Sequence, residues 1–465
     1  RERIIEAVTG VSGTIVMASM TTITGLLCLL LATMPQTRQF AVSTSVGIFA
    51  TALLSLSLFP AFLSLQKPVE ESRVNRVKTD FLSRWLEHLG PRLIRRRWPA
   101  PLILIVLITV FGILIPGVES NTSPISYYPA RSAVIRELKK FSLEVGGVDE
   151  LTVTLTAPEN EANFFLRPEI LTTIYSMEKR IGADPDISHH ISLASYLSFA
   201  SKTILGEDGD FSNRGLNLLV GRMLLSGGNS PDARLSDESF SEMKLKLRIF
   251  NGAGQISVDE NETRRITEKL RRVLDEEIPE GISWEITGMP LEFLKLSETM
   301  RRDFLISTLA ALAAIGLVCT IAFRSLWWGF LAIVPMIAGI AATFILMTIF
   351  SIPLDMTTIM VSCVAIGVGV DDAIHFLLQN RGQLKEHPEN PETVARESLL
   401  RTGRPIILTT AAIVLGLAWF ILAEFRPIMY FGVLIVFTLS SACLATLFLL
   451  PPLAGRKRSV KIANR

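Results

Sequence analysis

Long apolar runs separated by short polar turns make up most of the chain. A helix needs about 20 mostly apolar residues to cross the roughly 30 Å hydrocarbon layer of a membrane. Eight segments meet this requirement, and the Gly and Pro residues within them are tolerated in membrane helices. They are residues 13–34, 40–65, 99–118, 303–323, 327–350, 355–379, 404–424 and 427–452. The pattern predicts a mostly α protein, a polytopic helical membrane bundle.

One long polar segment, residues 119–302, interrupts these runs. Alternation with period 2 predicts strands, and apolar spacing with period 3.6 predicts helices. The expected strands are 148–157, 244–250 and 282–288, and the expected helices are 169–182 and 260–278. Residues 188–228 fit neither period, and we expect a mobile helical flap there. The segment therefore predicts a small α/β domain with helices on one face of a sheet.

Basic residues are distributed unevenly among the polar segments. They gather in the loop 66–98, in the segment 380–404 and at the end of the chain, whereas the turns MPQTRQ, SIPLD and AEFRP hold few. Short loops rich in Lys and Arg remain in the cytoplasm. With eight spans all three basic segments fall on one side, which makes the domain 119–302 extracytoplasmic. We expect a multi-pass protein of a plasma membrane, and the short outer turns favour a bacterial inner membrane.

These patterns together divide the chain into six parts. Residues 1–66 hold two transmembrane helices, 67–98 a cytoplasmic linker with an amphipathic helix, 99–118 one transmembrane helix, 119–302 the extracytoplasmic α/β domain, 303–455 a five-helix transmembrane bundle, and 456–465 a basic cytoplasmic tail.

The remaining composition restricts the chemistry. The formal net charge is +2, so the total gives no indication of nucleic-acid binding. All four cysteines lie in apolar runs, which fits neither a disulfide framework nor a zinc site. The soluble segment has no GxSxG, Walker or GxGxxG motif, and no acidic residue stands at HExxH spacing from the adjacent His189 and His190. We therefore expect a binding or conduit domain, with no enzyme activity, no metal and no cofactor.

The two ends of the chain resemble each other. A shift of 391 residues aligns the first 61 residues with the last two spans without a gap, and it pairs Gly25 with Gly416 and Phe40 with Phe431. We therefore expect the first two spans to repeat the last two. The same shift would put a counterpart of Asp371 before the first residue, so we expect the chain to be the C-terminal portion of a twelve-span protein. Residues 1–66 would then hold the last two helices of its first repeat.

The sixth span contains two adjacent acidic residues, Asp371 and Asp372, in the stretch GVGVDDAIHFL. A charged side chain at the centre of a bilayer costs roughly 2.5–3.5 kcal/mol on insertion scales. Two neighbouring carboxylates also repel each other when both are ionised. No Lys or Arg lies in the middle of any predicted span to pair with them. The pair therefore predicts a proton or cation site.

Five further residues could support this pair. Gly367 and Gly369 would let a neighbouring helix approach closely. His375 lies one helical turn after Asp371, where it could relay protons or mark the inner boundary of the membrane. Thr409 and Thr410, early in the seventh span, could donate hydrogen bonds to the carboxylates or bond back to their own helix.

The segment GVGVDDAIHFLLQ, in a span that follows the order of one span, a domain and two spans, resembles the resistance-nodulation-division (RND) superfamily. The similarity is closest to MMPL-type predicted exporters and their sterol-sensing-domain relatives, and residues 392–420 resemble that family's linking helix and next span. The resemblance implies RND-type repeats, a porter-like outer domain, and proton- or cation-driven export of lipid or other hydrophobic molecules. It also implies that Asp371 and Asp372 are the coupling site.

Several alternatives remain open. The bundle could be a lipid-binding sensor like the sterol-sensing proteins, or a protein-translocation auxiliary like SecD and SecF, whose motif has a single Asp followed by Ala-Asn. A lipid-modifying membrane enzyme is disfavoured by the absence of a nucleophile or metal motif. The expected partners are membrane lipids, a hydrophobic substrate, a proton or cation, the missing N-terminal repeat and a possible second copy of the chain. The chain does not indicate the substrate.

Overall fold

The structure is a computed structural model. It describes residues 2–65, 82, 84–88, 99–114, 124–227, 234–250, 256 and 259–455. The basic tail 456–465 and most of the linker 67–98 lie outside these residues. By its internal contacts the chain divides into two compact units, one formed by Arg1–Asn121 with Glu298–Arg465 and the other by Thr122–Ser297.

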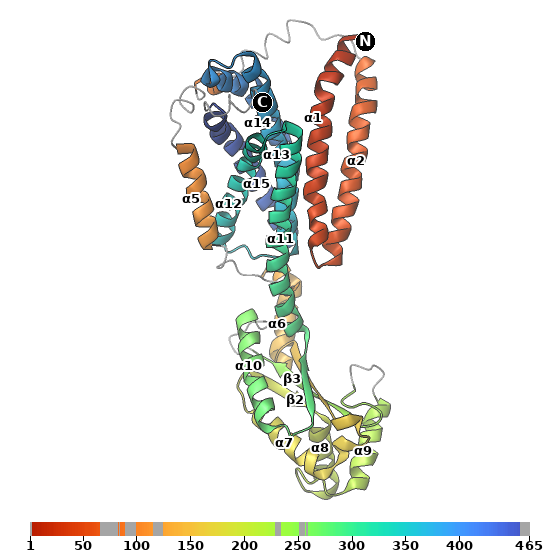
Figure 1. Ribbon diagram of the computed structural model, residues 1–465. Helices are drawn as coiled ribbons and strands as arrows, with labels where there is room; N and C mark the ends of the chain where they lie inside the picture. Colours follow the sequence, from red (N-terminus) through yellow and green to blue (C-terminus); the bar gives the residue numbers. More distant parts are fainter. Residues whose placement is uncertain are drawn as a thin grey trace. The chain divides into compact units, whose positions relative to one another are not determined.

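The first unit consists of helices (Figure 1). They are α1 (Glu2–Leu27), α2 (Pro35–Ser64), α5 (Pro99–Leu114), α11 (Met289–Phe323, which belongs to this unit from Glu298 onward), α12 (Leu326–Ile349), α13 (Met356–Glu386), α14 (Pro391–Leu417) and α15 (Arg426–Ala454). Among the described residues, 7 helices are long and apolar enough to cross a membrane, and α5 is a shorter apolar helix. The predicted polytopic helical membrane fold is therefore confirmed, with seven of the eight expected spans matched by a helix of spanning length.

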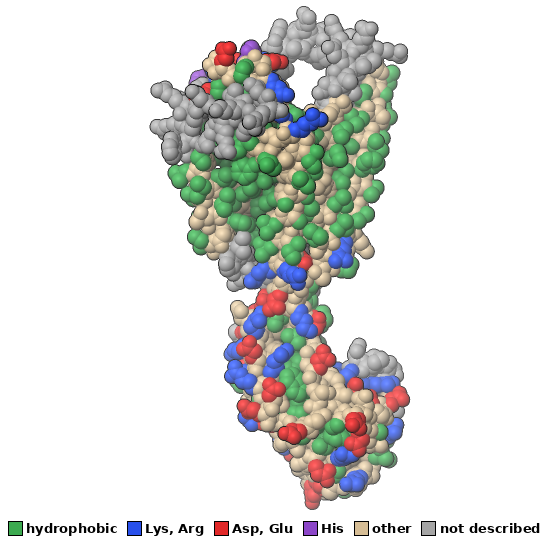
Figure 2. Space-filling view, in the orientation of Figure 1, with side chains coloured by type: hydrophobic (Ala, Val, Ile, Leu, Met, Phe, Trp, Pro, Cys, Tyr) green, Lys and Arg blue, Asp and Glu red, His purple; other side chains and the backbone are tan. Residues whose placement is uncertain are grey.

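The hydrophobic surface of these helices has a simple physical origin. Apolar side chains on the outside of a membrane bundle meet lipid and cost nothing there, whereas the same side chains would be unfavourable in water. Figure 2 shows hydrophobic side chains spread over the helices of the first unit, while Lys, Arg, Asp and Glu side chains are frequent on the second unit. Each unit thus has the surface that its expected solvent requires.

The ends of the first unit share one layout, as the sequence repeat suggested. After α1 comes the 3₁₀ helix η1, Cys28–Leu31, and after α14 comes the 3₁₀ helix η7, Ala418–Leu422. The second long helix of each pair begins at Pro35 and at Arg426, positions that differ by the same 391 residues. The two helix pairs are therefore equivalent structural elements.

Helix α13 lies at the centre of the packing in the first unit, where it contacts α1, α12, α14 and α15. Its start is fixed by a capping box, in which the Asp355 side chain accepts a hydrogen bond from the Thr358 backbone N–H. Val370, Ala373 and Ile374 are completely buried. The middle of this helix is consequently held by neighbours on several sides.

The second unit contains an antiparallel four-stranded sheet of order β2-β3-β1-β4. The strands are β1 (Asp149–Thr156), β2 (Ile187–Ile191), β3 (Glu242–Ile249) and β4 (Ser283–Thr287), and the helices are α6 (Ala133–Val145), α7 (Pro168–Gly182), α8 (Leu193–Leu205), α9 (Arg214–Gly227) and α10 (Glu260–Glu277). Burial alternates strictly along β1 and β3, so one face of the sheet forms the core. Apolar residues of α7 and α10 complete that core. The three strands and two helices expected from periodicity are all present.

The expectation for residues 188–228 was wrong in part. This segment is largely helical as expected, in α8 and α9, but it also holds most of the edge strand β2, which the expected helical flap did not include. The pairing of β2 with β3 shifts register between Ile187 and His189, which hides the period of 2. His189 and His190 accordingly lie on a strand and not on a helix.

One carboxylate of the second unit is completely buried. Glu178 of α7 is 0% exposed, and its Oε2 accepts a hydrogen bond of 2.5 Å from the hydroxyl of Ser192, the N-cap residue of α8. Its Oε1 has no partner among the described residues. Burial raises the pKa of Glu178 above its usual 4.5, and hydrogen bonds from Ser192 and Ser195 oppose this effect.

This environment predicts that the contact between α7 and α8 weakens as the pH rises. The pKa of Glu178 is higher in the folded state than in the unfolded state, so just above pH 4.5 the folded state binds more protons. The free energy of unfolding therefore falls as the pH rises and the carboxyl ionises. In Glu178→Gln the pH dependence should disappear, and the free energy of opening α7 and α8 at neutral pH should rise by about 1 kcal/mol. Hydrogen exchange of α7 and α8 peptides in the whole chain, corrected for intrinsic rates, measures both effects.

The matched control is Glu169→Gln, which changes an exposed carboxylate on the same helix. This variant should keep the pH dependence of the original protein. An unchanged pH dependence in Glu178→Gln would contradict the assignment to Glu178.

Candidate functional site

The predicted acidic pair lies halfway along α13. Asp371 and Asp372 are the sixteenth and seventeenth of its 31 residues. Successive residues of a helix point about 100° apart, because there are about 3.6 residues per turn. The two side chains therefore face different neighbours, and both are partly buried.

The two carboxylates receive unequal hydrogen bonds. Thr410 of α14 donates its hydroxyl to Oδ2 of Asp372 at 2.8 Å. The hydroxyl of Thr21 on α1 lies 3.5 Å from Oδ1 of Asp371 and also 2.8 Å from its own helix, at the carbonyl of Ala18. Asp372 is thus held firmly by α14, whereas Asp371 has only a long contact with α1.

The other candidate residues differ in how close they come to the pair. The hydroxyl of Thr409 bonds back to the carbonyl oxygens of Pro405 and Ile406, both at 3.0 Å, so that of the two threonines only Thr410 reaches an aspartate. The side chain of His375 is exposed on the described bundle and makes no hydrogen bond to either aspartate there. The structure therefore does not join His375 to the pair.

No positive charge compensates the pair within the described part of the chain. No Lys, Arg or His there forms a salt bridge with Asp371 or Asp372. The Cys319 thiol of α11 is near enough to Asp371 for an electrostatic interaction. The described residues also contain no cluster of three or more His, Cys, Asp or Glu suited to a metal ion. Two adjacent carboxylates without a fixed counter-charge can take up and release a proton or a small cation.

Gly367 brings α1 into backbone contact with α13. A Cβ atom on Gly367 would lie 3.1 Å from both Cα and the carbonyl oxygen of Thr22. The hydroxyl of Thr22 donates a buried hydrogen bond of 2.9 Å to the carbonyl of Gly367. Gly369 lies against α12 instead, where a Cβ atom would meet the sulfur of Met336 at 2.9 Å. The two glycines therefore admit two different neighbours.

Sequence reasoning missed the residues that α1 contributes. Thr21 and Thr22 contact the acidic helix, but the sequence analysis considered only Thr409 and Thr410 of α14. The available signal was a second Thr-Thr pair in the first span, although the shift of 391 residues aligns it with Ala412 and Ile413 and not with Thr409 and Thr410.

The sequence analysis also missed the buried carboxylate of Asp303 in the first unit. Asp303 of α11 is 4% exposed and accepts two hydrogen bonds from Thr33, one from its backbone N–H at 2.6 Å and one from its hydroxyl at 2.9 Å. Thr33 lies in the turn between η1 and α2. Asp303 therefore links α11 to the segment between α1 and α2, and both of its carboxylate oxygens accept a hydrogen bond there.

Comparison with known proteins places the site in a wider group. The model of the MMPL family matches residues 1–106 and 254–461. The chain is also 24% identical over 359 residues to "Putative membrane protein MJ1562" of Methanocaldococcus jannaschii, an alignment that covers 76% of this chain and 89% of that protein. The aspartate pair and the helices α1 and α14 lie inside the segments that the family model matches.

The contact between α1 and α13 should be sensitive to a single methyl group. Gly367→Ala would press Cβ against the backbone of Thr22, which cannot move aside as a side chain can. Overpacking of this kind costs about 1–3 kcal/mol. We expect a lower unfolding temperature in detergent and faster hydrogen exchange in α1 peptides.

Gly382→Ala on the same helix is the matched control, because nothing lies within 4 Å of the added Cβ. It should leave exchange in α1 unchanged. Equal behaviour of the two variants would show that the close approach at Gly367 does not hold α1 in place.

Proposed function

We propose, given that the chain belongs to the MMPL family, that it acts as a secondary transporter that exports lipid or other hydrophobic molecules and is driven by protons or cations. The observation that supports this proposal most directly is the position of Asp371 and Asp372 in the middle of α13, with one neighbouring threonine on α1 and one on α14. Two carboxylates at the centre of a spanning helix are costly to keep there, and such residues commonly mark ion or proton sites.

The coupling step would be the uptake and release of a proton by the pair. One elementary charge that crosses 100 mV gains about 2.3 kcal/mol. Free energies of 1–3 kcal/mol are typical of coupling between two sites, so one proton can bias an equilibrium between two bundle conformations. Sodium would act through the same charge, and a comparison of pH and sodium gradients separates the two ions.

The hydrogen bonds suggest which elements respond. Protonation of Asp372 would weaken its attraction for the Thr410 hydroxyl and remove the repulsion between the adjacent carboxylates. Helix α14 would then be freer to move against α13, while the backbone contact at Gly367 keeps α1 in place. The proposed motion is therefore a displacement of α14 relative to α13 and α1.

The membrane setting supports a hydrophobic substrate. The helices of the first unit offer substrate a direct path from the lipid, and the second unit would serve as the extracytoplasmic binding or conduit domain. The excess of basic residues in 66–98 and 380–404 supports this orientation in a plasma membrane. We propose that the protein does no covalent chemistry on its substrate.

Neutralising the pair should abolish coupling. Asn has nearly the shape of Asp but cannot take up a proton, so Asp371→Asn, Asp372→Asn and the double variant should each lower gradient-driven transport at least about tenfold, a loss of roughly 1.4 kcal/mol or more. The measurement uses the full-length protein in proteoliposomes under an imposed pH gradient. Internal pyranine reports proton entry, and a fluorescent NBD-labelled lipid reports movement between leaflets.

Glu386→Gln is the control for the charge change, because it removes an exposed carboxylate at the end of the same helix. It should transport at the original rate. Gradient-driven transport at the original rate in the double Asn variant would refute the coupling role. Binding of the labelled lipid without any gradient-dependent movement in the original protein would instead favour a sensor.

The hydrogen bond from Thr410 should matter more for transport than the one from the neighbouring Thr409. Thr410→Val leaves Asp372 without its donor, and hydrogen bonds to charged groups contribute about 1.5–3 kcal/mol, so transport should fall about tenfold or more. Thr410→Ser keeps the hydroxyl and should restore most of the rate. Thr409→Val removes only a bond back to α14 and should have little effect. Equal losses in both valine variants would argue against a specific role for Thr410.

A further inference from the structure

Helix α9 of the second unit exposes an apolar face. Leu218, Leu219 and Met223 are 44%, 58% and 65% exposed, although leucine and methionine usually avoid water. The opposite side of the helix is buried, with Asn217 at 2% exposure. Exposed apolar clusters on an otherwise polar domain commonly mark binding surfaces.

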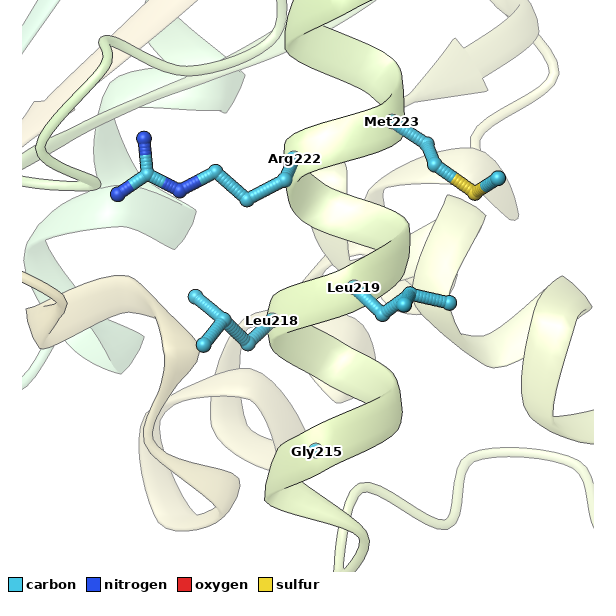
Figure 3. Close-up of a pocket in the computed structure, with 5 residues that line it drawn as sticks. All are labelled: Gly215, Leu218, Leu219, Arg222 and Met223. Carbon is cyan, nitrogen blue, oxygen red and sulfur yellow. The ribbon is translucent and has the colours of Figure 1, made fainter.

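These residues line a shallow cavity of about 460 Å³ together with Gly215 and Arg222. Their spacing of three and four residues places all five on one side of α9. Within this face, Figure 3 shows Arg222 and Leu218 directed toward one edge and Leu219 and Met223 toward the other. Gly215 has no side chain to fill the space at the end of the row, so the cavity has a charged flank and an apolar flank.

Arg222 is the charged residue that lines this cavity, and nearby groups orient it. Its guanidinium carbon lies 5.5 Å from the ring centroid of Phe240, a cation–π contact. Phe240 is itself 0% exposed, and Gly221 admits the ring so closely that a Cβ there would meet it at 3.0 Å. No carboxylate of the described residues forms a salt bridge with Arg222. An oriented positive charge beside exposed leucines therefore stands without a compensating anion.

We infer that this face of α9 binds an amphiphile with one anionic head group and an alkyl chain. The head group would pair with Arg222, and the chain would cover Leu218, Leu219 and Met223. A guanidinium matches the geometry of carboxylate and phosphate oxygens.

A protein partner fits this face less well. Stable protein interfaces bury about 800 Å² on each side and involve some 20–30 residues. The cavity itself, with five lining residues over little more than two turns of one helix, is far smaller than such an interface. The inference deepens the proposed function. The role of the bound molecule as cargo rests on that function, but its binding at α9 does not depend on transport.

The test uses photocrosslinking in the full-length protein, purified in a nonionic detergent. The probe is a palmitic acid analogue with a diazirine in its alkyl chain, and the comparison is the corresponding uncharged alcohol. Labelled peptides are identified by mass spectrometry. We expect the peptide that holds residues 215–223 to be labelled about five- to tenfold more by the acid than by the alcohol, the effect of one ion pair.

Arg222→Gln should reduce labelling by the acid to the level of the alcohol. Arg214→Gln, which changes an exposed arginine on the same helix outside the cavity, should keep the preference for the acid. Gly215→Leu should reduce labelling by both probes, because its side chain would fill the cavity. Equal labelling by acid and alcohol in the original protein, or the same response to both arginine variants, would overturn the inference.

The double Asn variant of Asp371 and Asp372 separates this inference from the proposed function. It should keep the α9 labelling while it loses gradient-driven transport. Transport by the original protein without selective α9 labelling would refute the α9 site alone. Selective labelling in a protein that never transports would refute the proposed function alone.

Discussion

The free-energy cost of two carboxylates in the middle of a spanning helix governs the arrangement of the first unit. Such groups are tolerated where other helices or hydrogen-bond donors cover them and not where they meet lipid tails. In this bundle α13 is accordingly surrounded by four helices, and Thr410 gives Asp372 a donor at 2.8 Å. The two carboxylates thus favour helices beside α13 that cover them or offer a hydrogen-bond donor. The apolar side chains, which pack equally well against lipid, place fewer restrictions on the neighbours.

The repeat explains why the pair faces two similar helices. α1 and α14 begin equivalent helix pairs, and each brings a threonine to one aspartate. The two contacts are nonetheless different. On the α1 side the backbones of Thr22 and Gly367 lie close together, the Thr22 hydroxyl donates to the Gly367 carbonyl, and the contact from Thr21 to Asp371 is long, whereas the α14 side depends on the short hydrogen bond from Thr410 to Asp372. A backbone contact between two helices does not change when a carboxyl gains a proton, but a hydroxyl-to-carboxylate bond does. Under the proposed coupling, protonation would therefore act more strongly on the α14 interface than on the α1 interface.

The sequence predicted those features that depend on long-range periodicity. Spans of 20 or more apolar residues and strands with alternating burial, such as β1 and β3, leave a pattern that local chemistry does not obscure. Asp371 and Asp372 were recognisable because charge in an apolar run is costly. Their neighbour Thr21 was not, since a threonine looks like an ordinary member of a span until another helix is placed beside it. The strand β2 was missed because its register shift breaks the period on which recognition depends.

The second unit combines an ordered core with a surface that the core does not explain. Packing of α7 and α10 on the sheet accounts for the buried faces of those helices, and salt bridges such as that between Lys269 and Asp186 account for part of their charge. Neither accounts for α9, whose outward Leu218, Leu219 and Met223 remain largely exposed, at a cost in free energy in water. Such a face is retained at a cost of stability only if something other than folding selects for it. The proposed transport of hydrophobic molecules would use this apolar surface to receive substrate, and Arg222 at its edge, which forms no salt bridge among the described residues, would restrict the receiver to amphiphiles with a negative head group.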